Sequence, residues 1–292
     1  MKDKEDVIAS ESKLHKLGYV DFVSNLPQEQ QNMLETSSIQ NYIPWRAVWK
    51  LSSLSTPCRL VFDASQPTQS GYALNDILAK GINNLNKLQE ILIRWQLHTI
   101  GVHTDVSKMY NSINLHPDHW TLQRYIWQDE LDPLKIPRQK VIKTLIYGVR
   151  SSGNQSEHGL RRLAEMYKSQ YPKVNEVISS DVYVDDCITG DTDKSTAHQT
   201  ADELEIVTSN GGFKLKGFTF SLEDPPSHLT EDGVSIGVGG MKWYSKDDEI
   251  SLCIPELNFA PKRRGKKEFC NQKYHSGSFN SSSLHLKSGR NL

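Results

Sequence analysis

The pattern of hydrophobic and polar residues divides the chain into short strands and helices that follow one another. Apolar side chains recur at helical spacing between Leu85 and Trp95, which predicts an amphipathic helix over 83–97. Further helices are expected after Gly153 and over 195–209. Runs rich in β-branched and aromatic residues predict strands over 42–49, 59–62, 99–105, 120–127, 141–147, 176–184, 214–220 and 234–243. This mixture favours an α+β fold.

The two ends of the chain have a different pattern. Residues 1–40 are charged and Gln-rich with weak helical signals, and we interpret them as a partly helical leader appended to the fold. A basic cluster covers 262–267, and 275–292 is rich in Ser, Asn and Gly without periodicity. Such a composition is typical of a disordered tail.

Composition excludes several classes of protein. The 34 basic residues nearly cancel the 35 acidic ones, and a net charge of −1 argues against a globally basic nucleic-acid binder but allows a local basic groove. No apolar run approaches the roughly 18 residues of a membrane span, and the charged N-terminus is not a secretory signal. The four cysteines lie far apart, so they indicate reduced thiols in an intracellular protein rather than a zinc site.

Three carboxylates carry the strongest chemical signal. Asp105 ends one β-rich run, and Asp185 with Asp186 ends another. If the two strands are neighbours, their ends bring Asp105 and Asp185 together, and such an arrangement needs a cation because like charges repel. Carboxylate oxygens suit Mg²⁺, and two such ions can promote phosphoryl transfer. The alternative is a plain polar turn after a strand, as we expect for Asp247 and Asp248.

The surrounding residues resemble the catalytic motifs of reverse transcriptases. Tyr183-Val184-Asp185-Asp186 is similar to the catalytic hairpin of that family, and Asp105 followed by Tyr110 resembles its first catalytic motif. Other segments resemble, in order, a fingers strand, a positioning loop, a Lys-bearing motif and a primer-grip turn: 59–65, 145–155, 212–219 and 240–243.

The wording of the motifs resembles one branch of this family, the reverse transcriptases of BEL/Pao-type LTR retrotransposons. The resemblance covers about residues 40–260. It is carried by five short motifs: Val-Phe-Asp-Ala-Ser, Leu-Asn-Asp-Ile-Leu, Lys-Met-Tyr-Asn, Gln-Arg-Tyr-Ile-Trp and Tyr-Val-Asp-Asp-Cys. It implies a right-hand polymerase with an antiparallel palm sheet backed by helices. The fingers would span 41–98 and the palm 99–245, with a partial or absent thumb and the tail over 246–292.

The resemblance also implies roles at a catalytic centre. Asp105, Asp185 and Asp186 would be catalytic and, with the carbonyl of Val106, would hold two Mg²⁺ ions, for which Mn²⁺ could substitute. Asp186 would support the site more than bind both ions. The primer 3′-hydroxyl would attack the α-phosphate of a deoxynucleotide.

Further residues would bind the nucleotide and the primer. Tyr110 would exclude ribonucleotides by clashing with a 2′-hydroxyl, and Arg59 would neutralise the triphosphate. Tyr147-Gly148 stands where many relatives carry Gln-Gly, and Gly148 permits close backbone approach. Either Lys214 or Lys216 could protonate the pyrophosphate. The primer and template would contact Tyr183, Val184, Gly240, Met241 and Trp243.

The expected activity is RNA-directed DNA synthesis by a fragment of a retrotransposon polyprotein. Its partners would be an RNA or DNA template, a nucleic-acid primer and deoxynucleotides, with no membrane, in a cytoplasmic particle or in the nucleus. The alternative is an inactive transposon-derived relic or interaction module. Two features favour this alternative. The chain ends soon after the primer-grip-like turn, and it contains no recognisable RNase H or integrase segment.

Overall fold

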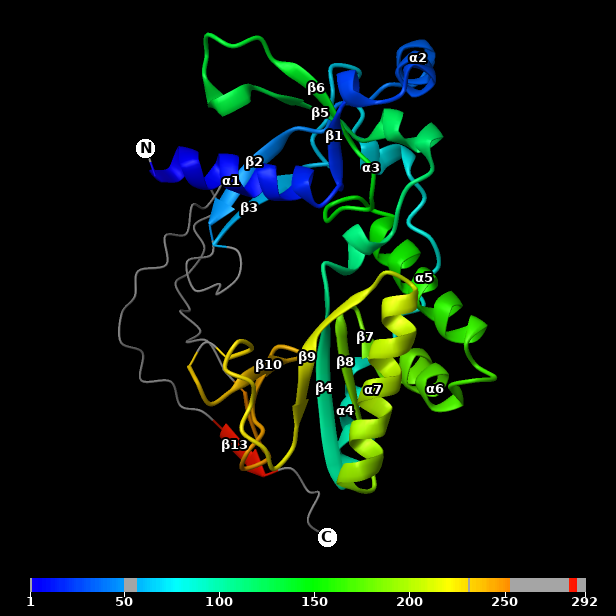
Figure 1. The fold of residues 1–292 in the computed structure, drawn as a ribbon, viewed down its shortest axis with the longest axis vertical. Helices are drawn as coiled ribbons and strands as arrows, with labels where there is room; N and C mark the ends of the chain where they lie inside the picture. The colour runs from blue at the N-terminus through cyan, green and yellow to red at the C-terminus, as the bar shows by residue number, and fades with distance from the viewer. Residues whose placement is uncertain (1, 50–56, 231, 253–283, 288–292) are drawn as a thin grey trace, which may run out of the picture.

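The sheet that carries the three acidic residues has four antiparallel strands in the order β7-β8-β4-β9. They are β4 (Ile100–Ser107), β7 (Val182–Tyr183), β8 (Asp186–Asp191) and β9 (Lys214–Phe220). The computed structural model describes residues 2–49, 57–230, 232–252 and 284–287. Over these ranges the fold is a mixture of helices and antiparallel sheets, arranged as two lobes that Figure 1 shows one above the other.

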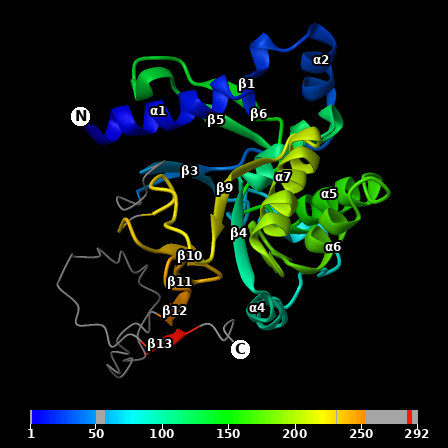
Figure 2. The same cartoon turned by 60° about the horizontal axis from the view of Figure 1, so that its bottom comes forward.

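Three helices cover one face of this sheet: α5 (Ser152–Met166), α6 (Pro172–Ser180) and α7 (Lys194–Asn210). Figure 2 shows them together on one side of β4. Val106 and Cys187 of the sheet pack with apolar residues of the helices, among them Leu160, Val177 and Val207. Burial of this shared apolar face fixes the sheet against the helices.

A helix and a second sheet cover the opposite face. The helix is α4 (Leu88–Leu97), and the sheet contains β10 (Ile236–Val238), β11 (Met241–Tyr244), β12 (Glu249–Leu252) and β13 (Leu284–Lys287). Trp95 and Trp243 meet edge to face at 4.8 Å between ring centroids. With Ile188 of β8 they form the apolar core of this side. The central strands are thus covered on both faces, which explains why all five residues over 100–104 are buried, including the polar His103 and Thr104.

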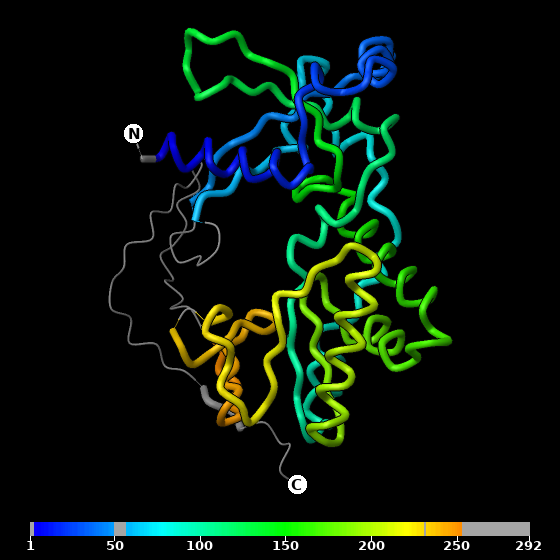
Figure 3. The backbone as a smooth tube through the Cα atoms, in the orientation of Figure 1, coloured from blue at the N-terminus to red at the C-terminus, as the bar shows by residue number. Residues whose placement is uncertain are grey.

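The upper lobe contains a sheet in the order β1-β6-β5 and a separate β2-β3 hairpin. The strands are β1 (Val20–Phe22), β2 (Trp45–Trp49), β3 (Cys58–Phe62), β5 (Arg124–Trp127) and β6 (Arg138–Ile142). The helices are α1 (Lys2–Lys16), α2 (Gln28–Thr36) and α3 (Leu74–Ile77), with 3-10 turns η1 (Val23–Asn25), η3 (Pro117–Leu122) and η4 (Asp129–Leu131). Figure 3 shows the chain leaving this lobe after α3, forming α4 and β4 below, and returning to the upper lobe before α5.

The N-terminal residues are part of the upper lobe, which corrects the interpretation of 1–40 as an appended leader. Val7 of α1 lies in the core of this lobe, and β1 pairs with β6. The buried Glu11 carboxylate accepts hydrogen bonds from Lys140 Nζ and from the Tyr125 hydroxyl. Strands β5 and β6 also belong to the upper lobe, although they fall within the 99–245 segment expected to form one unit.

Several elements differ from the sequence prediction. The segment 176–184, expected as a strand, is mostly α6, because Pro172 starts a helix whose Val174, Val177 and Ile178 pack into the core at helical spacing. The predicted helix over 83–97 begins only at Leu88. The predicted strands over 120–127 and 234–243 are interrupted, the first by η3 and the second by a Gly239-Gly240 turn between β10 and β11.

Two further observations concern the sequence-based expectations about the ends and membranes. The basic cluster at 262–267 lies outside the described residues, as does most of the tail expected to be disordered. Among the helices that the structure describes, none has the length and hydropathy needed to cross a membrane.

Candidate active site

The register between β4 and β8 brings two acidic segments to the same place. Asp105 is the Cα partner of Asp186 across this antiparallel pair. The β7-β8 hairpin reverses direction through Val184 and Asp185, so Asp185 lies at the tip beside the end of β4. The amide of Val106 donates a hydrogen bond of 2.7 Å to the carbonyl oxygen of Asp185. The sheet therefore holds Asp105 and Asp185 together at one end of its strands, although they lie far apart in the sequence.

The turn that presents Asp185 has an unusual backbone. Val184 has a φ of +56°, a conformation that β-branched residues rarely adopt. Such a residue costs about 1–3 kcal/mol and persists only where the surrounding structure enforces it. Here the short β7-β8 pairing and the Val106 hydrogen bond enforce the turn.

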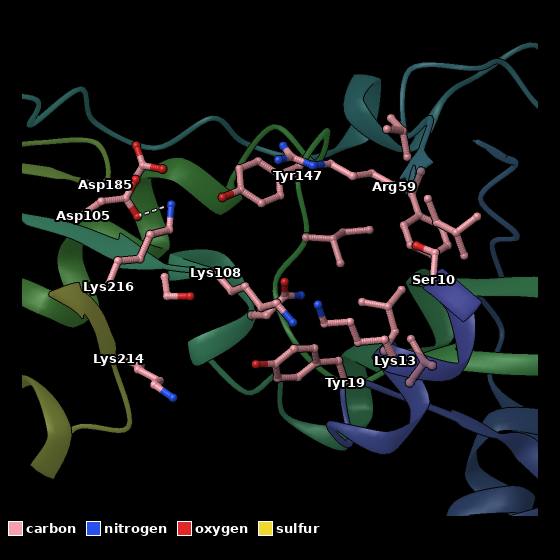
Figure 4. A pocket seen from close by; sticks show the side chains of 18 of the residues that line it. Ser10, Lys13, Tyr19, Arg59, Asp105, Lys108, Tyr147, Asp185, Lys214 and Lys216 are labelled. Carbon is pink, nitrogen blue, oxygen red and sulfur yellow. Dashed lines mark ion pairs between the residues drawn. The ribbon is translucent and has the colours of Figure 1, made fainter. Parts of the chain in front are cut away.

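Asp105 has a cationic neighbour and an unsatisfied oxygen. The ammonium nitrogen of Lys216, on β9, lies 2.8 Å from Oδ1 of Asp105 (Figure 4). Apart from this ion pair, the buried Oδ1 has no hydrogen-bond partner among the residues that the structure describes. A buried carboxylate oxygen without a hydrogen bond is costly. Asp105 is therefore suited to bind a further cation or donor.

The ionised form of the Asp185 carboxyl is disfavoured when no cation is bound beside it. Burial raises the pKa of its carboxyl above the ordinary value, and the nearby carboxylates of Asp105 and Asp186 raise it further. Lys216 opposes this effect. A cation between Asp105 and Asp185 would remove the repulsion that destabilises the ionised form.

Asp186 is held by other groups of the protein. The Nε2 atom of His103 lies 3.1 Å from its Oδ1, and the amide of Gly239 donates to its Oδ2 at 3.3 Å. Because both oxygens already have partners in the protein, Asp186 is suited to a supporting role, and its expected role as a metal ligand stays a prediction. Its contacts connect β8 to β4 and to the β10-β11 turn.

The donors present fit a magnesium ion that is shared with a phosphate substrate. The described residues contain no group of three or more His, Cys, Asp or Glu side chains placed to hold a metal. Asp105 and Asp185 supply two carboxylates, and Mg²⁺ is commonly held by one or two carboxylates together with substrate phosphates. The side chain of Val106 is buried among the helices, so this residue could contribute only its backbone carbonyl.

A cavity of about 1090 Å³ separates the carboxylates from the upper lobe. Asp105, Asp185 and Lys216 line one side, and Arg59 of β3 and Tyr147 line the other (Figure 4). Figure 4 shows the Arg59 side chain running from β3 toward the ring of Tyr147. The cavity thus contains positive charge from both lobes next to a pair of carboxylates.

A further wall of the cavity comes from the N-terminal segment, which sequence reasoning did not assign to the site. Lys13 of α1 and Tyr19 line it together with Lys108, which follows β4. The ammonium group of Lys108 lies 5.3 Å from the centroid of the Tyr19 ring. Burial lowers the pKa of Lys108, and the charge of Lys13 lowers it further. The wall is therefore positively charged and suited to an anion.

The predicted nucleotide-binding side chains are divided between two cavities. Arg59, Tyr147, Lys214 and Lys216 line the one described above, whereas Tyr110 lines a second, smaller one. Tyr110, in η2 (Met109–Ser112), packs against Tyr147 with 4.2 Å between ring centroids. Gly148 has a φ of +95°, and a Cβ there would lie 2.6 Å from the carbonyl oxygen of Phe62. Lys214 lines the cavity but lies away from the carboxylates, whereas Lys216 contacts Asp105 (Figure 4).

The residues predicted to bind primer or template do not form one exposed surface. Gly240 is exposed in the β10-β11 turn, while Met241 and Tyr183 are partly buried against the core below. Trp243 is 0% exposed, and its Nε1 donates to Oδ1 of Asp248 at 3.0 Å. The assignment of Trp243 to primer binding is therefore corrected, because its side chain is part of the core.

Three polar residues organise the site although sequence reasoning gave them no role. Asn75 donates to the carbonyl oxygen of Gly148 at 2.8 Å and accepts from the Arg150 amide at 2.7 Å. Asn111 donates hydrogen bonds to Thr144 and Leu145, in the segment before Tyr147. His103 contacts the carboxylate of Asp186. Asn75 and Asn111 lie in segments that carry the family resemblance, and this was the one available signal for them.

Comparisons with known proteins add little to this geometry. No family model and no curated protein matches the chain. Among solved structures, it is similar to a crystal structure of prototype foamy virus protease-reverse transcriptase, with a TM-score of 0.49 and 16% sequence identity. The match covers 73% of this chain and 23% of that one. A likeness of this size carries no weight for the activity, which is inferred from the residues and their geometry.

Proposed function

We propose that the chain is a template-directed DNA polymerase of the reverse transcriptase type, which adds deoxynucleotides to a primer on an RNA or DNA template. The observation that supports this most is the meeting of Asp105 and Asp185 at a cavity whose opposite wall carries Arg59. In this proposal the lower lobe is the palm and the upper lobe the fingers.

The reaction joins a primer 3′-hydroxyl to the α-phosphorus of the nucleotide and breaks the bond to the β-phosphate, releasing pyrophosphate. Asp105, Asp185 and the carbonyl of Val106 would hold Mg²⁺, which when bound neutralises the charge that develops on the attacking and leaving oxygens. Arg59 would bind the triphosphate oxygens, since a guanidinium suits this geometry.

Lys216 is the better candidate for donating a proton to the pyrophosphate, because its ammonium group already lies at the carboxylates. Lys214 is the alternative. The primer would lie against Gly240 and Met241, whose turn is joined to the site through Gly239 and Asp186. An origin in a BEL/Pao-type retrotransposon, and work in a cytoplasmic particle or the nucleus, are proposed from the wording of the motifs.

Primer extension on purified full-length chain tests the proposal. The substrates are a DNA primer annealed to an RNA template, deoxynucleotides and Mg²⁺, with Asp105→Asn and Asp185→Asn as variants. Asp202→Asn is the matched control, because Asp202 is exposed on α7, outside the site. We expect extension by the wild type and the control, and a loss of about 100-fold or more in both site variants.

Thermal unfolding of each variant separates loss of activity from loss of fold. Normal extension by folded Asp185→Asn would refute the site. A folded wild type that binds primer and template but does not extend would favour the alternative, an inactive relic of the same fold.

A further inference from the structure

Two aromatic rings stand side by side next to Asp185, with Tyr147 lining the cavity that contains the carboxylates and Tyr110 lining a second cavity behind it. Tyr110 and Tyr147 meet edge to face, with 4.2 Å between centroids and 76° between planes. Both rings are close to Asp185. Burial is the main cause that raises the pKa of each phenol, and the charge of Asp185 raises it further. The pKa of Tyr147 rises to about 12, so its hydroxyl keeps its proton at neutral pH.

The backbone that carries Tyr147 is fixed on both sides. Before it, Nδ2 of Asn111 donates to Thr144 Oγ1 and to the Leu145 carbonyl oxygen, each at 3.1 Å. After it, Gly148 packs against β3 and accepts the hydrogen bond from Asn75. Since Asn111 follows Tyr110 directly, the same contact fixes the spacing between the two rings.

Tyr110 is confined from the other side as well. Its hydroxyl oxygen lies 3.6 Å from the position that a Cβ would take at Gly153, in the first turn of α5. The Tyr110 ring is therefore bounded by α5 and by Tyr147. Tyr147 is 51% exposed and lines the cavity, so its removal would open space beside Tyr110.

We infer that Tyr147 buttresses Tyr110, and that the two rings form a rigid wall that excludes a ribose 2′-hydroxyl. A single ring could turn about its side-chain bonds to admit the hydroxyl, whereas a ring packed against a second ring cannot do so without losing that contact. Tyr147 thus determines the preference for deoxynucleotides. This inference rests on the proposed function.

The test compares Tyr147→Ala and Tyr147→Phe with the wild type in single-nucleotide extension. The measured quantity is the ratio of kcat/KM for a deoxynucleotide to that for the ribonucleotide with the same base. Tyr147→Ala should lower this ratio by about tenfold or more, chiefly through a lower KM for the ribonucleotide. Tyr147→Phe keeps the ring and should keep the ratio. Tyr72→Ala, an exposed tyrosine outside the cavity, is the matched control.

A binding measurement makes the result independent of turnover. Affinities for dGTP and GTP are measured on the complex with a primer that lacks a 3′-hydroxyl, with Mg²⁺. Loss of preference in Tyr147→Ala with retention in Tyr147→Phe supports the buttress. An unchanged ratio in Tyr147→Ala, or loss in Tyr147→Phe, overturns it while wild-type extension still supports the polymerase. A wild type that neither binds nor adds nucleotides overturns both.

Discussion

His103 and Asp186 lie on neighbouring strands, β4 and β8, with the imidazole Nε2 3.1 Å from the carboxylate Oδ1. His103 is buried, and the second oxygen of Asp186 accepts from the Gly239 amide. The second carboxylate of the Asp-Asp pair therefore connects the β7-β8 hairpin to the β10-β11 turn. Asp186 thus holds the hairpin in place without lining the cavity, whereas Asp185 lines it.

Replacing Asp186 should consequently harm activity less than replacing either cavity carboxylate. Asp186→Asn keeps an oxygen for one contact, and the loss of a supporting partner at a metal site typically costs about 10–100-fold. We expect a decrease in primer extension within that range, clearly smaller than in Asp105→Asn or Asp185→Asn. Steady-state kinetics on folded variants measure it.

His103→Ala removes the same contact from the other side, so its effect and that of Asp186→Asn should not add in the double variant. His119→Ala, at an exposed position, is the control. Equal losses in Asp186→Asn and Asp185→Asn would show that Asp186 acts directly on the substrates or ions.

Asp185→Asn should stabilise the fold at neutral pH although it removes activity. The carboxyl pKa of Asp185 is raised in the folded state, mainly by burial, so the ionised group opposes folding above that pKa. As pH falls through the raised pKa toward the ordinary value of 3.8, the wild type takes up the proton and the advantage of the variant disappears.

Urea unfolding across this pH range, with a chelator to remove divalent cations, measures the difference in free energy of unfolding. Asp202→Asn should show no such dependence. A lower stability of Asp185→Asn than of wild type at pH 7 would contradict the electrostatic account.

Gly148→Ala should destabilise the protein more than another glycine with the same backbone conformation. Gly71 has a φ of +85° with open space around it, so Gly71→Ala should cost only about 1–2 kcal/mol. At Gly148 the added Cβ also meets the β3 backbone at Phe62, and such overpacking adds about 1–3 kcal/mol. Chemical denaturation of both variants measures the loss in free energy of unfolding. Equal losses in Gly148→Ala and Gly71→Ala would show that β3 moves aside without a measurable energetic penalty.

Glu11→Ala should show that α1 is an integral part of the upper lobe. The substitution leaves the buried Lys140 ammonium without its carboxylate, a change that typically costs about 3–5 kcal/mol. Glu5→Ala, exposed on the same helix, should change stability by less than about 0.5 kcal/mol. Unfolding free energies decide the matter, since a loss below about 1 kcal/mol for Glu11→Ala would mean that α1 contributes little.

Local pattern predicted those elements whose period was clear. The strand over 214–220 and the helix near 195–209 appear in the structure almost as expected, because each has regular spacing and a clear turn signal beside it. The prediction of a strand over 176–184 was wrong, because Val and Ile residues suit a strand as well as a buried helix. Residues 1–40 were wrongly interpreted as an appended leader, because the partners of Glu11 lie in strands that are distant in the sequence.

The order of residues along the chain was enough to select Asp105, Asp185, Tyr110 and Arg59 as candidates, since motif spacing is a property of the linear sequence. Three-dimensional packing decided that Lys216 rather than Lys214 contacts Asp105, and that Asp186 is held by His103. It also decided that Trp243 is buried. These outcomes depend on the register of β4 between β8 and β9 and on which faces are covered. Strand pairing and burial involve residues distant in sequence, and no local periodicity specifies them.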